Sequence, residues 1–133
     1  MNEPVTTLIG DLTSDVEFRI EDGMPEASFT VTWSPPWFDK PSGTWITPAS
    51  LSVRCTAMGE TARNMAVCLE RGDRVIVTGY LRQRSSATRE GERRRAIELA
   101  VTEVGASLRF TQIEVTRPGR AIPPVSGQDE PPA

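Results

Sequence analysis

Hydrophobic and polar positions alternate along several short stretches of the chain, with the period of two that is typical of a β-strand. The clearest case is residues 27–33, where apolar residues alternate with Ser and Thr. Before it, an apolar segment is interrupted at Gly10, which predicts a bulge or bend, with residues 16–20 continuing that strand as far as a turn at residues 21–23. The five predicted strands cover about residues 5–20, 27–33, 51–58, 75–84 and 97–102.

One segment between the third and fourth strands has helical spacing instead. Its apolar residues recur every three or four positions: Ala62, Met65, Ala66 and Leu69. Thr61 is a candidate N-cap, and Gly72 is a candidate stop signal. We expect a short amphipathic helix whose apolar stripe packs in the core.

Five strands with one helix between the third and fourth is the layout of the OB-fold, a small Greek-key barrel. Gly79, within the fourth strand, is where such a barrel would need a corner. The predicted class is therefore all-β, with a long hairpin formed by the last two strands. We expect one domain over residues 1–117 and a disordered tail over residues 118–133, which is rich in Pro and Gly and has an acidic tip.

Composition limits the functions that this fold can carry. The chain has 133 residues, a net charge of -3 and no His, which removes the commonest general base and metal ligand. It has no phosphate-binding loop, so we expect neither catalysis nor a metal or cofactor. Cys55 and Cys68 lack metal-site spacing and are expected to be buried thiols.

No apolar run approaches the roughly 20 residues needed to span a bilayer. Residues 1–3 also lack the basic and apolar regions of a signal peptide. We expect a cytoplasmic protein without a membrane partner.

A cluster of arginines occupies the middle of the predicted hairpin. Residues 82–95 hold two glutamates and six arginines, namely Arg82, Arg84, Arg89, Arg93, Arg94 and Arg95. A basic arm on an acidic protein favours an extended polyanion as its partner, and a solvated loop is the alternative. Residues 85–95 show no apolar period, so we expect an irregular projecting tip.

Three aromatic residues lie in a proline-rich segment after the second strand: Trp37, Phe38 and Trp45. We expect a long loop without regular pairing. Aromatic faces near the surface can stack on nucleic-acid bases, at about 1 to 3 kcal/mol per base. Alternatively, these rings fold back as a local mini-core or pack at a subunit contact.

Five segments together resemble the bacterial single-stranded DNA-binding protein family, in particular its actinobacterial branch. They are IGDLTSDVEFRI, ASFTVTW, WFDKPSGTW, LSVRCTAMGETARNMAVCLERGDRVIVTGYLRQRSSATREGERR and EVGASLRF. The resemblance covers about residues 2–117 in consistent order and spacing. It implies an OB-fold homotetramer at the nucleoid that binds single-stranded DNA without sequence preference and supports replication, recombination or repair.

The chain departs from this family at the positions that stack on bases. Trp37 or Phe38 matches the family's aromatic residue in the loop after the second strand. Ser52, Met58 and Ser86 stand where the family has three further rings. A Met thioether lies against a base more weakly than a ring does, so we expect reduced affinity and a strong dependence on salt.

The candidate DNA-binding residues are Trp37, Phe38, Trp45, Arg54, Met58, Tyr80, Arg82, Arg84, Arg89, Arg93, Arg94 and Arg95. Replacement of Trp37 by Ala should remove most of the stacking that remains.

The end of the chain also departs from the family, whose tail closes with acids, a proline and a phenylalanine that recruit replication and repair enzymes. Here the sequence is Asp129, Glu130, Pro131, Pro132 and Ala133. A methyl group replaces the terminal ring, so the resemblance implies weakened recruitment.

Two functions stay open at this point. One is a sequence-independent single-stranded DNA binder. The other is an assembly or regulatory paralogue that has largely lost DNA binding and acts through protein contacts or mixed oligomers.

Overall fold

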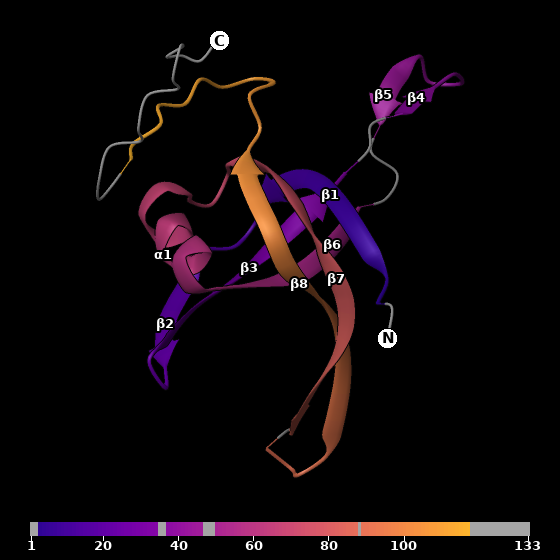
Figure 1. Cartoon of the computed structure of the whole chain (residues 1–133). Helices are drawn as coiled ribbons and strands as arrows, with labels where there is room; N and C mark the ends of the chain where they lie inside the picture. The colour runs from indigo at the N-terminus through magenta and orange to yellow at the C-terminus, as the bar shows by residue number, and fades with distance from the viewer. Residues whose placement is uncertain (1–2, 35–36, 47–49, 88, 118–133) are drawn as a thin grey trace.

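The computed structural model describes residues 3–34, 37–46, 50–87 and 89–117, with only the backbone given for residues 37–39, 46 and 86 (Figure 1). The helix is α1 (Gly59–Cys68). The strands are β1 (Val5–Leu12), β2 (Glu17–Glu21), β3 (Met24–Trp33), β4 (Trp37–Asp39), β5 (Thr44–Ile46), β6 (Leu51–Met58), β7 (Arg74–Ala87) and β8 (Arg93–Ala106). The predicted tail at residues 118–133 lies outside the described residues.

Five of these strands close into a barrel. β1 pairs with β7, β7 with β8, β8 with β6, β6 with β3, and β3 returns to β1. The β6–β8 pair is parallel and the others are antiparallel. Because α1 lies between the third and fourth barrel strands, the predicted OB-fold layout is confirmed (Figure 1).

The alternating apolar residues fill the barrel as predicted. Phe29, Val31, Cys55, Val77 and Leu99 are all buried in one core cluster. Full burial of such side chains stabilises the fold by about 1.5 to 3 kcal/mol each. A register slip of one residue would turn each of these faces outward, so the alternation also specifies how the strands pair.

The alternation fails where strands leave the core. Trp33 and Leu51, predicted on the inner face, are cross-strand partners at the end of β3 and β6 and are exposed. Ile97 is also exposed, although it shares the parity of buried Leu99. These three predictions are wrong because the strands extend beyond the barrel. Their side chains still alternate between two faces there, but the inward face has no core to cover.

Two glycines mark close backbone approaches in the barrel wall. The β7–β8 register shifts between Thr78 and Gly79, and a Cβ at Gly79 would collide with the backbone of Ala100. The predicted corner at Gly79 is therefore confirmed. Of the bulge or bend predicted at Gly10, the bulge is wrong, because Gly10 lies in an uninterrupted β1–β7 register. Glycine is needed there because the backbone of Thr32 crosses closely.

β2 does not continue β1, contrary to prediction, but pairs antiparallel with β3. The turn between them is Asp22-Gly23, and both residues have positive φ values, 52° and 76°. This backbone twist is typical of a two-residue hairpin and favours an Asn-Gly or Asp-Gly pair. The turn signal was therefore correct, but it joins β3 of the five-stranded ring to β2, which lies outside the ring.

Two segments predicted to be irregular are hairpins. β4 and β5 pair over residues 37–46, around a turn in which Gly43 has a φ of 70°. β7 and β8 stay paired as far as Ala87 and Arg93, so the irregular tip is much shorter than residues 85–95. Backbone hydrogen bonds between the paired strands hold both hairpins together. These strands need no alternation of apolar and polar residues, because neither of their faces covers a core.

The helix differs from prediction at its start. Its N-cap is Met58, which makes no side-chain capping hydrogen bond, and not Thr61. Ala62 and Met65 are buried, whereas Ala66 is exposed. In the part of the chain that the structure describes, no helix is long and apolar enough to cross a membrane.

Candidate nucleic-acid interface

The outer surface of β6 carries the residues that sequence parity assigned to it. Ser52, Arg54 and Met58 are all exposed, which confirms that they share one face. Thr56 has the same parity but is buried, because the carboxylate of Glu98 covers it. β3 and β8 flank β6 on its two sides, so this face continues onto both. We call it the β6 face.

At one end of the β6 face, hydroxyl groups form a ladder across three segments of the barrel. The hydroxyls of Thr13 and Thr32 lie 2.8 Å apart, and those of Thr32 and Ser52 lie 2.9 Å apart. Ser52 therefore brings a hydrogen-bonding group to one of the positions where a stacking ring was expected. Such hydroxyls can donate to phosphate or sugar oxygens but offer no stacking surface.

Carboxylates lie beside the arginines of this face. Arg54 Nη2 is 3.9 Å from Glu17 Oε1. Arg19, which β2 adds to the same surface, lies 3.5 Å from Glu26. Exposed pairs of this kind contribute at most about 1 kcal/mol each. These pairs matter more for the binding of a phosphate than for stability, because each carboxylate offsets the positive charge of the arginine beside it.

Glu98 of β8 is the centre of a charge cluster that the sequence analysis did not predict. Its side chain is 3% exposed. Arg82 donates from Nε to Oε2 at 2.8 Å, Arg84 donates from Nη1 to Oε1 at 3.3 Å, and Thr56 donates from Oγ1 to Oε1 at 3.1 Å. The hairpin register pairs Arg82 with Glu98 directly, but that register could not be read from the sequence.

The electrostatics of the cluster follow from these contacts. Burial alone would raise the pKa of Glu98, but the hydrogen bond and charge of Arg82, with help from Thr56 and Arg84, hold it below 4.5. The same carboxylate adds to the effect of burial on Cys55, whose pKa is raised to about 12. Cys55 is thus a buried, protonated thiol, as predicted, whereas Cys68 is exposed, contrary to prediction.

The remaining predicted arginines lie toward the end of the β7–β8 hairpin, which projects from the barrel (Figure 1). Arg89, Arg93, Arg94 and Arg95 are all exposed. The register places Arg94 on the same hairpin face as Arg84, with Arg93 and Arg95 on the other face. Arginines therefore line both sides of the arm, and we call residues 82–95 the basic arm.

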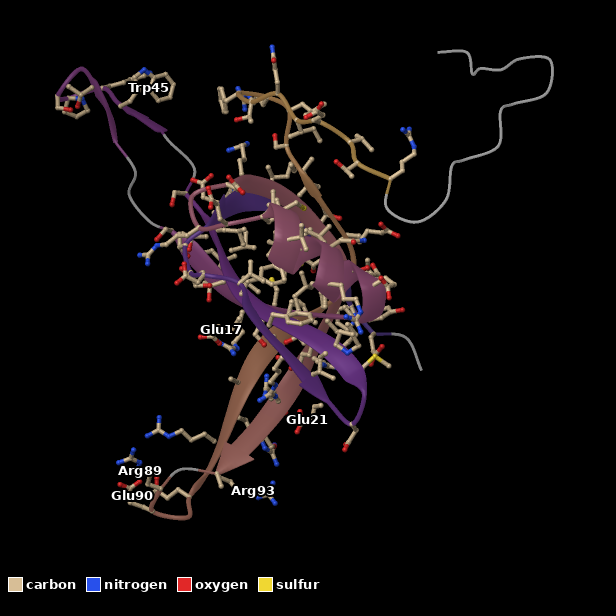
Figure 2. All side chains as sticks on the ribbon, turned by 90° about the vertical axis from the view of Figure 1, so that its left-hand side faces the viewer. Glu17, Glu21, Trp45, Arg89, Glu90 and Arg93 are labelled. Carbon is tan, nitrogen blue, oxygen red and sulfur yellow. The ribbon has the colours of Figure 1, made fainter. Side chains whose placement is uncertain are left out.

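The β4–β5 hairpin carries the predicted aromatic residues at the opposite end of the molecule. Trp45 is 69% exposed. Phe38 pairs with Trp45 in the β4–β5 register, and only the backbone of Trp37 and Phe38 is described. Figure 2 shows Trp45 at one end and Arg89 and Arg93 at the other, with Glu17 between them.

Tyr80 lies two residues before Arg82 on the same outer face of β7. It is also next to Val5 of β1, and this surface exposes Ile9 and Ile76 as well. We call Val5, Ile9, Ile76 and Tyr80 the β1–β7 apolar patch. An exposed apolar patch is typical of a contact with another protein and not of a charged groove that binds DNA.

A groove of about 780 Å³ lies between α1 and the segment after β8, lined in part by Met65, Cys68, Phe110 and Ile113. Its lining includes none of the predicted DNA-binding residues. Arg74 and Arg109 lie over the ring of Phe110, at 5.5 and 5.1 Å from its centre. Among the described residues, no group of three or more His, Cys, Asp or Glu could hold a metal ion.

Comparison with known proteins now adds to this geometry. A model described as "Single-strand binding protein family" matches residues 4–107. A "Single-stranded DNA-binding protein" from Mycolicibacterium smegmatis is 46% identical over 116 residues, which cover 86% of this chain and 70% of that protein. A protein with the same description from Paenarthrobacter aurescens is 44% identical over 119 residues, covering 89% and 70%.

A solved structure agrees with the fold. The crystal structure of the small single-stranded DNA-binding protein from Streptomyces coelicolor superposes with a TM-score of 0.68 and 26% identity. The match covers 81% of this chain and 97% of that one.

Proposed function

Because the chain belongs to the single-strand binding protein family, we propose that it binds single-stranded DNA without sequence preference, along the β6 face. The observation that carries the proposal is the placement of an exposed Trp45 and an exposed basic arm at opposite ends of the molecule. Aromatic stacking combined with a positively charged track is the usual means of binding a single strand without reading its sequence.

The residues divide into two roles in this proposal. Trp37, Phe38 and Trp45 stack on bases at the β4–β5 hairpin, and Met58 adds a weaker contact. The other role is contact with phosphates, which falls to the arginines Arg54, Arg82, Arg84, Arg89, Arg93, Arg94 and Arg95. Since Arg54, Arg82 and Arg84 already lie beside carboxylates, most of the electrostatic attraction comes from the outer part of the basic arm.

We also propose that the protein is a homotetramer. A homotetramer with D2 symmetry needs two different contacts between subunits. The β1–β7 apolar patch offers one, and in the described part of the chain residues 5–10 pair on one side only, with β7. The segment after β8 offers the other, since Leu108, Phe110, Ile113 and Val115 are exposed. Tyr80 would then contact a subunit rather than DNA.

The biological setting follows from the ligand. We propose a role in replication, recombination or repair at the nucleoid in the cytoplasm, by binding rather than by catalysis. Residues 1–117 would form the binding domain. Recruitment through Asp129, Glu130, Pro131, Pro132 and Ala133 would be weak, and these residues lie outside the described part of the chain.

The test is a titration of the purified protein with oligo-dT, followed by tryptophan fluorescence at low and at physiological salt, with molecular mass measured alongside. Binding by a tetramer at both salt concentrations, weakened about tenfold or more by W45A, is the expected result. The variant W45F keeps a ring and serves as the control. Equal affinity for W45A and wild type would contradict the proposed site.

The second candidate function is that of an assembly or regulatory paralogue. It is favoured by Ser52 and Met58 at stacking positions and by the carboxylates beside Arg54, Arg82 and Arg84. Binding that is absent at physiological salt, together with stable mixed tetramers with a full-length relative, would support it.

A further inference from the structure

Glu98 lies where a DNA strand would pass from the β6 face to the basic arm. In β8 it is the cross-strand partner of Arg82, and on its other side it is the parallel neighbour of Arg54 on β6. Arg84, two residues after Arg82 in β7, donates a hydrogen bond to the same carboxylate. Two of the arginines assigned to phosphate binding thus contact one carboxylate, and Arg54 is its neighbour in the strand register.

The carboxylate cannot move away from these arginines when DNA arrives. Glu98 is almost fully buried, and Thr56, itself buried, donates a hydrogen bond to it from the barrel wall. The arginine side chains are much more accessible, with 49% of Arg82 and 41% of Arg84 exposed. A phosphate can therefore reach these guanidinium groups only from outside, while the fixed negative charge stays behind them.

The contacts also occupy donors that a phosphate would use. Arg82 directs both Nε and Nη2 to Oε2 of Glu98, each at 2.8 Å. This is the edge of a guanidinium group that binds an oxyanion in a forked geometry. Arg82 in this arrangement keeps its charge but presents fewer donors and a partly neutralised field to the strand.

We propose that Glu98 limits the phosphate binding of Arg82 and Arg84, and thereby sets how strongly DNA binding depends on salt. The inference rests on the proposed function and concerns the same site. Arg82 and Arg84 contribute together about one net positive charge to DNA binding, whereas the outer arginines of the arm have no buried carboxylate behind them among the described residues.

The test is the variant E98Q, which keeps the size of the side chain and removes its charge. Affinity for oligo-dT should rise about threefold at low salt, the factor expected when one like charge about 7 Å from a phosphate is removed in water, since the guanidinium groups lie between the two. The plot of log affinity against log salt concentration should become steeper by about 0.7, the value for one further phosphate contact on a single strand.

The control is E70Q, which removes an exposed negative charge just after α1, outside the β6 face and the basic arm. It should change affinity less than twofold. An equal rise for E70Q and E98Q would show a general effect of net charge and would overturn the inference. Unchanged or weaker binding by E98Q would overturn it as well, because Glu98 would then only position the arginines.

If E98Q does not fold, R84Q and R94Q decide the question in the wild-type background. Both residues lie on the same face of the arm, and R84Q should reduce the salt slope less than R94Q does. Equal reductions would overturn the inference. Binding by the wild type with no difference among these variants refutes only this inference. Absence of binding by the wild type and every variant refutes the proposed function too.

Discussion

Arg82 and Glu98 face each other across β7 and β8, and both Nε and Nη2 of the arginine lie 2.8 Å from the same oxygen, Oε2 of the glutamate. Both side chains lie on the outer face of the barrel, where the carboxylate is buried and half of the arginine is exposed. The pair lies where the basic arm leaves the barrel. It holds β7 and β8 together at the base of the arm, and its carboxylate offsets part of the positive charge of the arm there.

The first prediction concerns pH and stability. The folded pKa of Glu98 is held below the ordinary value of 4.5, so the folded state binds its proton more weakly than the unfolded state does. Its contribution to stability is therefore fully present above about pH 4.5 and is lost as the pH falls through the folded pKa. The urea midpoint of the wild type should exceed that of E98Q at pH 7, and this difference should shrink on acidification.

The measurement compares the two proteins at one fixed concentration, because the stability of an oligomer depends on concentration. A difference between the midpoints that stays constant from pH 7 to pH 3 would show that the ion pair adds nothing that depends on ionisation.

The second prediction restores a ring to the β6 face. Ser52 is exposed, so the variant S52W should present an indole to the DNA and raise affinity by about 1 to 3 kcal/mol. The hydrogen bond with Thr32 is lost, at a cost to stability of about 1 kcal/mol. Equilibrium titration with oligo-dT measures the gain, and V67W, on the exposed surface of α1, is the control.

The third prediction concerns the barrel corner. In G79A the new Cβ would collide with the backbone of Ala100, so unfolding free energy should fall by about 3 kcal/mol. Gly105 lies in β8 with open space around it, and G105A should stay within about 0.5 kcal/mol of the wild type. Urea unfolding of both variants provides the comparison. Similar stabilities would show that the backbone at residue 79 relaxes without loss.

The fourth prediction concerns the two thiols. Cys68 is exposed, while Cys55 is buried with its pKa raised to about 12. Because the thiolate is the reactive form, a thiol reagent at pH 8 should modify one cysteine in the folded protein and two after denaturation. C68S should leave the folded protein unreactive, and C55S should leave one reactive thiol. Two rapid equivalents in the folded wild type would contradict the placement of Cys55.

Much of the fold was determined by local pattern in the sequence. Apart from Trp33, Leu51 and Thr56, the alternation in residues 27–33 and 51–58 predicts the core-facing side chains, because a strand sends successive residues to opposite faces whatever its neighbours are. The Asp22-Gly23 turn and the glycine corner at residue 79 are local as well. The concentration of arginines in residues 82–95 needs no structure to be seen.

The environment of those arginines was decided only by the tertiary structure. Thr56 and Glu98 are 42 residues apart and meet because β6 and β8 pair in parallel, which no local pattern specifies. The register of the long β7–β8 hairpin brings Arg82 and Glu98 together, and residues 85–95 between them have no apolar alternation to fix that register. Positive charge in the sequence therefore revealed the arm, but long-range pairing determined which arginines already have a carboxylate beside them.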